Sequence, residues 1–238
     1  MGEVRELNPG DWLYPHVQVR SYMLVEAGLT GRIVATVDGQ SGAGAMALST
    51  PMRNAAGNLN WLTHRSAIGR YQALSHVRLR EIPHSEALLM QADKDFYLAL
   101  YARMELINLS DRFGFAILAL LPAIDRFKAL LIAWSLFYGE VSEGPRGLRI
   151  RVPIPGRKNH IAQVIRTSSV TLDGILRELK TAENWEREGD FVTFNASTLQ
   201  SVHEWMRHAE GKDAYLARPA RVEDMLLAAQ AEVAEIIH

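Results

Sequence analysis

The sequence contains no cysteine among its 238 residues. Disulfide bonds, zinc–thiolate sites and cysteine-ligated iron–sulfur clusters are therefore excluded. A long apolar run is also missing. The most hydrophobic stretch, residues 113–137, includes Pro122, Asp125, Arg126 and Lys128, whereas a membrane-spanning helix needs about 20 residues with few charges. The opening residues, MGEVRELNPGDWL, carry charges where a secretory signal needs an apolar segment. We expect a cytoplasmic protein with no membrane partner.

Charge of one sign is not in excess. The net charge is −1, so any contact with nucleic acid would depend on a local group of basic residues. Common enzyme motifs are missing as well. There is no phosphate-binding loop, no Gly-x-Ser-x-Gly, no His-Glu-x-x-His and no cysteine nucleophile. We therefore predict a protein that is not an enzyme and that uses no cofactor and no metal.

Residues 7–83 have the pattern of β structure. Short runs that alternate apolar and polar residues, such as GRIVATVDGQ and RYQALSHVRLREIP, are separated by turn residues. Val77 and Leu79 lie two positions apart, as on one face of a strand, and Asp38-Gly39 predicts a hairpin turn. The spacing of the turns favours a small all-β roll, barrel or sandwich.

After Pro83 the pattern becomes helical. Apolar or small residues at steps of three, four or seven predict one long amphipathic helix, with the stripe Leu100, Met104, Ile107, Gly114, Ile117 and Leu121. We interpret this stripe as the seam of a parallel dimer; the alternative is packing against its own domain. Pro122 is expected to end the helix. A second helix is predicted from Ala123 to Tyr138, ending at Gly139.

The stretch HIAQVIRTSSVTLDGILREL, from His160 to Leu179, predicts two short helices joined by a polar turn. Ser168 is the expected N-cap of the second helix, because its hydroxyl can accept a hydrogen bond from an amide one turn later. Two short helices with a tight turn match a helix-turn-helix. The expected buried residues are Ile161, Val164 and Ile165 on the first helix and Leu172, Leu176 and Leu179 on the second.

Strand-like segments flank this pair of helices. LRIRV precedes it in the Gly/Pro-rich stretch 140–156, and WEREGDFVTF follows it as a predicted tight hairpin with residues 188–190 at its tip. Such a hairpin would make the module winged. Residues 197–238 predict a helical tail in two pieces around Pro219.

Basic residues are concentrated around the helix pair. Residues 146–177 contain one acid, Asp173, and seven basic residues, namely Arg146, Arg149, Arg151, Arg157, Lys158, Arg166 and Arg177. A positive surface beside a helix-turn-helix is what contact with DNA phosphates requires. The alternative is the solvated face of an ordinary helical hairpin. His160 is expected to lie at the surface.

The order of these elements resembles that of the CRP/FNR family of bacterial transcription regulators. HIAQVIRTSSVTLDGILREL looks like the family's helix-turn-helix, NPGDWL like its opening strand turn, and GLTGRIVATVDGQ like its Gly-Leu-x-Arg hairpin. LSHVRLREIPHSEALLMQADKDFYLAL resembles the last strand of its roll and the start of its dimer helix. The resemblance covers about residues 5–200.

The resemblance implies an α+β fold in four parts. These are an N-terminal β-roll of the double-stranded β-helix or jelly-roll type at 1–99, a central dimerisation helix at 100–121, a winged helix-turn-helix at 122–200 and a helical C-terminal extension at 201–238. It also implies a homodimer that reads a two-fold-symmetric DNA site through its second helix. Double-stranded DNA, a second copy of the chain and RNA polymerase are the implied partners, together with an unidentified small-molecule effector. The implied DNA-binding residues are Lys158, Ser168, Ser169, Val170, Thr171, Asp173 and Arg177.

The effector region departs from the family's pattern. Members that bind cyclic nucleotides hold the ribose with Gly-Glu, and here Asn58 follows Gly57. An Arg-Ser-Ala for the phosphate occurs at Arg65 and Ser66, but about two residues too early relative to LREIP. We therefore expect an effector other than a cyclic nucleotide. Haem would need an axial ligand, for which the candidates are His64, His76 and His84.

The second helix departs too. Many members begin it with Arg-Glu and place Arg four residues later, where this sequence has Ser169, Val170 and Gly174. Arginine to guanine is the commonest specific contact, so the usual readout is absent. Arg166 also replaces a turn residue that is often glycine. Two hypotheses follow: a regulator with a different operator, or a family member that acts as a protein-interaction dimer without sequence-specific DNA binding.

Overall fold

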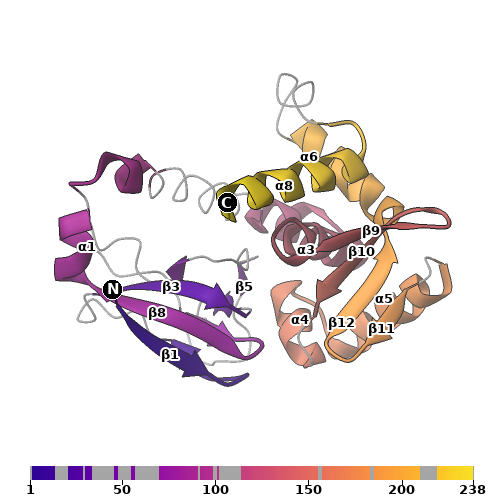
Figure 1. Ribbon diagram of the computed structural model, residues 1–238. Helices are drawn as coiled ribbons and strands as arrows, with labels where there is room; N and C mark the ends of the chain where they lie inside the picture. Colours follow the sequence, from indigo (N-terminus) through magenta and orange to yellow (C-terminus); the bar gives the residue numbers. More distant parts are fainter. Residues whose placement is uncertain are drawn as a thin grey trace. The chain divides into compact units, whose positions relative to one another are not determined.

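The computed structural model of the chain describes residues 2–13, 21–28, 30–33, 46–47, 55–56, 70–90, 92–98, 101, 114–154, 157–182, 185–209 and 219–237. The predicted mixture of helices and strands is confirmed, with strands first and helices dominating later (Figure 1). By its contacts the chain forms two compact units. The first contains Met1–Ala119 with Arg157–Arg166, and the second contains Leu120–Gly156 with Thr167–His238.

The first unit contains two open antiparallel sheets. One has the strand order β1-β8-β3-β6 and the other has the order β2-β7-β4-β5. The strands are β1 (Glu3–Leu7), β2 (Trp12–Leu13), β3 (Ser21–Ala27), β4 (Thr30–Ile33), β5 (Met46–Ala47), β6 (Ala55–Ala56), β7 (Arg70–Ala73) and β8 (Val77–Pro83), and the helix α1 (His84–Met90) follows. The predicted Asp38-Gly39 turn lies outside the described residues.

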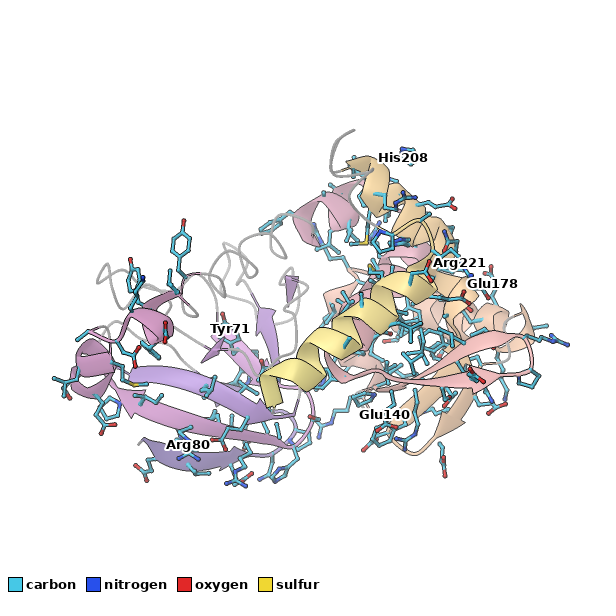
Figure 2. All side chains as sticks on the ribbon, turned by 45° about the horizontal axis from the view of Figure 1, so that its top comes forward. Tyr71, Arg80, Glu140, Glu178, His208 and Arg221 are labelled. Carbon is cyan, nitrogen blue, oxygen red and sulfur yellow. The ribbon has the colours of Figure 1, made fainter. Side chains whose placement is uncertain are left out.

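Alternating side chains build the core of the first unit. Along β8 the burial pattern alternates, and Val77 and Leu79 are completely buried, as their spacing predicted. They pack with residues of β1, β2, β3 and β7 in one apolar cluster, against which the partly buried Tyr71 also packs (Figure 2). The members of the cluster are Leu7, Leu13, Met23, Val25, Ala73, Val77 and Leu79.

A proline separates the helical segment 114–120 from the helix α3 (Ala123–Tyr138). Pro122 has extended backbone angles and caps α3, which ends at Gly139, so the predicted bounds of this helix are confirmed. The amide of Gly139 donates to the carbonyl of Ser135 at 3.0 Å. A β-carbon on Gly139 would lie 2.4 Å from the same oxygen, so the chain needs glycine where it leaves the helix.

The second unit is built around one antiparallel sheet with the order β11-β12-β10-β9. Helix α3 packs on β10 and also contacts four other elements of this unit (Figure 1). The strands are β9 (Glu140–Gly144), β10 (Gly147–Pro153), β11 (Glu186–Glu188) and β12 (Phe191–Asn195). The helices are α5 (Ser169–Ala182), the 3₁₀ turn η2 (Ala196–Leu199), α6 (Gln200–Ala209) and α8 (Val222–Ile237).

The predicted helical tail packs on the second unit. Gln200 ties it there, since its Nε2 donates to the carbonyl of Ala220 at 3.0 Å and its Oε1 accepts from the amide of Val222 at 2.9 Å. His203 Nε2 lies 2.9 Å from the carbonyl oxygen of Pro219. Val222 and Leu226 are buried, and α8 contacts η2 and α3. The tail therefore contributes to the core of this unit.

Candidate nucleic-acid interface

The turn before α5 is shaped by two residues. Arg166 has a left-handed backbone with φ of 49°, a conformation that costs a non-glycine residue about 1 kcal/mol or more. Ser168 then caps α5: its Oγ accepts from the amide of Thr171 at 3.0 Å and lies 2.9 Å from the Thr171 hydroxyl. The predicted N-cap is confirmed. Helix α4 (Lys158–Val164) precedes this turn.

Helix α5 has one buried and one exposed face. Leu172, Ile175 and Leu179 are buried, whereas Leu176 is only half-buried. The prediction that Leu172 and Leu179 are buried is therefore confirmed, and the prediction for Leu176 is wrong. The buried face of the helix includes Ile175 in its place. The outward face contains Ser169, Val170, Thr171, Arg177 and Glu178.

Two features of the outward face differ from an ordinary solvated helix. Val170 leaves 78% of its surface exposed, although valine is an apolar residue. Gly174 lies one turn further along in the helix interior, where glycine costs about 1 kcal/mol relative to alanine. Arg177 follows another turn along, and its Nε donates to the carbonyl of Asp173 at 3.3 Å.

The basic surplus counted along the sequence is smaller in space. Arg149 forms an ion pair with Glu186 at 2.9 Å, and Arg151 forms one with Glu140 at 3.1 Å. Both acids lie outside residues 146–177, so the count along the chain omitted them. Arg151 also lies over the ring of Phe191, 3.7 Å from its centroid. These two arginines therefore hold strands of this sheet together.

The β11–β12 hairpin turns where the sequence predicted. Gly189, with φ of 58°, and Asp190 form its tip. The hairpin is acidic: Glu186, Glu188 and Asp190 are exposed beside one arginine, Arg187, whose Nε donates to the carbonyl of Gly189 at 3.1 Å. An acidic hairpin repels phosphate, which the sequence reading of a wing had not considered.

The expectation that His160 is a surface group is wrong. Only 3% of its surface is exposed, because Ile161, Ala162 and Val164 of the same short helix are buried as well and little of α4 faces solvent. Its Nδ1 has no hydrogen-bond partner within the described part of the chain. Burial lowers the pKa of His160 below its ordinary value of 6.5, and the positive charge of Arg157 lowers it further.

The lowered pKa of His160 predicts a pH-dependent stability. Between pH 7 and pH 5 the unfolded chain binds a proton at His160 more readily than the folded chain, so the free energy of unfolding should fall as the pH falls below 6.5. In His160→Gln this part of the slope should vanish. Urea unfolding of both proteins at pH 5, 6, 7 and 8 measures the free energy of unfolding. At pH 8 the histidine is neutral in both states, so a difference between the two proteins there reflects packing alone. Equal slopes in both proteins would contradict the prediction.

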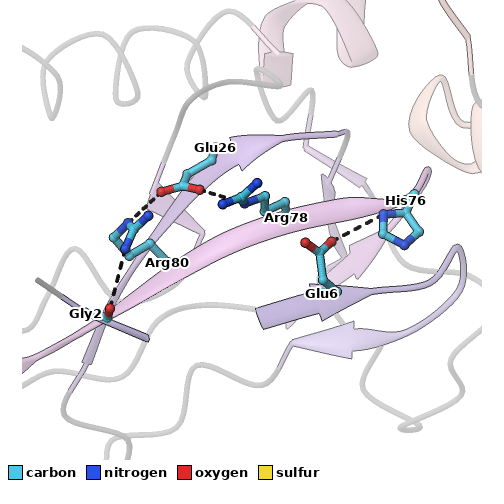
Figure 3. Close-up of polar contacts among 6 residues, drawn as sticks. All are labelled: Gly2, Glu6, Glu26, His76, Arg78 and Arg80. Carbon is cyan, nitrogen blue, oxygen red and sulfur yellow. Dashed lines mark hydrogen bonds and ion pairs between the residues drawn. The ribbon is translucent and has the colours of Figure 1, made fainter. Parts of the chain in front are cut away.

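Gly57, Asn58, Arg65 and Ser66 lie outside the described residues, as does His64. His76 is exposed, with its Nδ1 3.5 Å from Glu6 Oε2 (Figure 3).

Other charges of the first unit form ion pairs. Glu26 contacts Arg78 Nε at 3.1 Å and Arg80 Nε at 2.6 Å (Figure 3). Within the residues that the structure describes, no group of three potential metal ligands occurs and no helix is long and apolar enough to cross a bilayer.

Half of the predicted dimer seam can be examined. Gly114 and Ile117 are buried within the single chain and Leu121 is half-buried, while Leu100, Met104 and Ile107 lie outside the described residues. The exposed large apolar side chains of the segment 114–120 are Phe115 and Leu120, at 54% and 70%. The predicted seam did not include these two residues.

Solved structures with a similar fold come from several bacteria. FixK2 from Bradyrhizobium japonicum has a TM-score of 0.64 at 13% identity, over 85% of this chain and 96% of that chain. A mutant of CooA from Carboxydothermus hydrogenoformans has a TM-score of 0.62 at 16% identity, over 86% and 87%. A transcriptional regulator of the CRP/FNR family from Thermus thermophilus has a TM-score of 0.57 at 16% identity, over 85% and 97%.

No protein-family model matches the chain and no curated protein matches its sequence. Identities of 13–16% establish a fold rather than an activity. The resemblance stated from the sequence is thereby confirmed at the level of structure. The chain has the fold of the CRP/FNR family of transcription regulators.

Proposed function

We propose that the protein is a DNA-binding transcription regulator of the CRP/FNR type, a homodimer that reads a two-fold-symmetric operator through α5. The observation that carries the proposal is α5 itself, a helix of 14 residues that is capped by Ser168, preceded by a short helix and turn, and followed by the β11–β12 hairpin. This order is that of a winged helix-turn-helix, whose second helix enters the major groove with its N-terminal residues against base edges.

Phosphate and base contacts divide between two sets of residues. Lys158 and Arg177 are exposed cations suited to phosphate, which fixes the position of the protein on DNA without reading its sequence. Ser169 and Thr171 can hydrogen-bond base edges, Val170 can contact a thymine methyl, and Asp173 can accept from a cytosine amine. Ser168 contributes by capping the helix.

A second copy of the chain is the proposed cover for the exposed apolar side chains of the segment 114–120. Phe115 and Leu120 leave more than half of their surfaces in solvent, and a helix that packs on its copy would remove that surface from water. Sedimentation equilibrium of the purified chain tests this part: a dimer is expected, and Leu120→Glu should shift it toward the monomer.

The competing function is a protein-interaction dimer that no longer reads DNA. The acidic β11–β12 hairpin favours it, since carboxylates at the wing oppose phosphate, and α5 lacks the arginines that usually read guanine. Helix α5 decides between the two, because only the first function requires it to select DNA sequences.

The test is a selection of genomic fragments by the purified full-length protein, repeated at two salt concentrations. A shared motif with two-fold symmetry is expected, with affinity that falls as salt rises in proportion to the number of phosphates contacted. Lys158→Gln and Arg177→Gln should each weaken binding to all fragments and reduce the salt slope by about one unit.

The matched control for these variants is Lys94→Gln, an exposed lysine of the first unit that also loses one positive charge. Its binding should equal that of the unaltered protein. Enrichment of fragments without a common motif, abolished at moderate salt, would contradict sequence-specific regulation and favour the protein-interaction dimer.

The acidic hairpin is expected to weaken the binding of DNA by repelling its phosphates. Replacing Glu188 and Asp190 with their amides should raise affinity several-fold at low salt, because two charges that repel phosphate are removed, and the gain should shrink as salt screens them. Filter binding at two salt concentrations measures it. Glu143→Gln, on the opposite edge strand of the same sheet, is the control. An unchanged or weakened affinity would show that the hairpin lies away from the phosphates.

A further inference from the structure

Gly174 is a glycine that the fold does not require. It lies inside α5 and is not among the glycines with positive φ, so its backbone suits any residue. A β-carbon built on it would meet no atom within 4 Å. Alanine at this position would therefore fit the protein and favour the helix.

Other glycines of the chain have a reason within the fold. A β-carbon on Gly28 would lie 2.1 Å from the carbonyl oxygen of His76, and one on Gly139 would lie 2.4 Å from that of Ser135. At these two positions the chain's own backbone occupies the space. Gly189 also has empty space beside it, but its φ of 58° favours glycine. Gly174 has neither a close contact in the described part of the chain nor a positive φ, so the remaining reason for glycine is a ligand that approaches α5 from outside.

The neighbours of Gly174 indicate what approaches. One turn before it on the same face is Val170, with 78% of its surface exposed, and one turn after it is Arg177. Gly174 has no side chain, so this face of α5 has an apolar side chain one turn before it and a cation one turn after it. Apolar contact suits the methyl group of thymine, and a guanidinium suits phosphate.

We infer that Gly174 is a close-approach position at which α5 lies against the floor of the major groove, so that Val170 contacts the 5-methyl groups of thymines in each half-site. The inference rests on the proposed DNA-binding function and specifies how that function selects sequence. A methyl on Gly174 would hold the helix away from the bases, which loosens the contact of Val170 with them. The half-site should accordingly contain thymine where many related regulators read guanine with arginine.

The experiment uses the full-length protein and the DNA site found by the genomic selection. Uracil is substituted for each thymine of a half-site in turn, which removes only the 5-methyl group. Uracil at the thymine that Val170 contacts should weaken binding about fourfold, the value of one buried methyl group, and in Val170→Ala the same substitution should have no effect.

The protein variants are Gly174→Ala and Gly174→Leu, with Thr181→Ala in the same helix as the control that favours helix formation without adding atoms. Gly174→Ala should raise the thermal unfolding midpoint by about 2–4 °C and weaken binding about tenfold or more, with a larger loss for Gly174→Leu. Thr181→Ala should bind as the unaltered protein does.

Each outcome is decisive. A protein that selects no motif would overturn this inference together with the proposed function. A clear motif whose affinity is unchanged by uracil and by Gly174→Ala would leave the proposed function standing and overturn the inference alone. A loss of binding shared by Thr181→Ala would show that helix stiffness, rather than the close approach, matters at α5.

Discussion

Replacing Gly28 with alanine should prevent the first unit from folding. Gly28 follows β3 and has φ of 89°, in the left-handed region that disfavours side chains. A β-carbon there would lie 2.1 Å from the carbonyl oxygen of His76 and 2.8 Å from the Cα of Val77. Both atoms belong to the backbone where β8 begins, and β8 pairs with β3. Relief would require separating the two strands that enclose the core, and we expect a loss beyond about 4 kcal/mol.

Gly189→Ala is the matched control for this prediction. Gly189 also has a positive φ, of 58°, but a β-carbon on it meets no atom within 4 Å. It should therefore cost only the backbone preference, about 1–2 kcal/mol. Urea unfolding followed by circular dichroism compares the two variants. If both variants lost a similar free energy of unfolding, the cost would come from the positive φ alone. The close contact of Gly28 with the backbone at the start of β8 would then add nothing.

Local signals explain why some elements could be predicted to the residue. Pro122 and Gly139 bound α3 because proline cannot continue a helix and glycine leaves room at its end. Ser168 was identified as a cap because a hydroxyl before a helix satisfies an amide that otherwise lacks a partner. Each of these effects acts within about one helical turn, so the neighbouring sequence contains all the information that is needed.

Effects that act across the sheet could not be predicted in this way. The pairing of Arg149 with Glu186 depends on the register of β10, β11 and β12, which no short stretch of sequence determines. The burial of His160 depends on what covers α4 rather than on its own sequence. Counting charges along the chain therefore overestimated the positive surface. The fold could still be predicted from the order of elements, at 13–16% identity to its structural neighbours, because a layered core tolerates extensive replacement of apolar residues.

Replacing Phe194 with alanine should destabilise the second unit by about 3–5 kcal/mol. Phe194 is completely buried on β12, opposite Ile150 of β10. Its ring stacks on Trp185 with centroids 5.3 Å apart and an interplanar angle of 16°, and Trp185 in turn meets Phe127 of α3 at 5.8 Å. These three rings connect the sheet to α3. Trp185, the middle ring, directly precedes β11. The loss of these rings should therefore loosen the β11–β12 hairpin.

Phe191→Ala, on the same strand, supplies the comparison. Phe191 is only half-buried and its described ring contact is with the Arg151 guanidinium, so its loss should cost about 1 kcal/mol. The double variant of Phe127 and Phe194 tests the cluster directly, because both rings contact Trp185. If the rings act as one unit, its cost should be smaller than the two single costs combined. Additive costs, or equal losses for Phe191 and Phe194, would contradict a shared aromatic core and would leave the Arg149–Glu186 ion pair to fix the position of the hairpin.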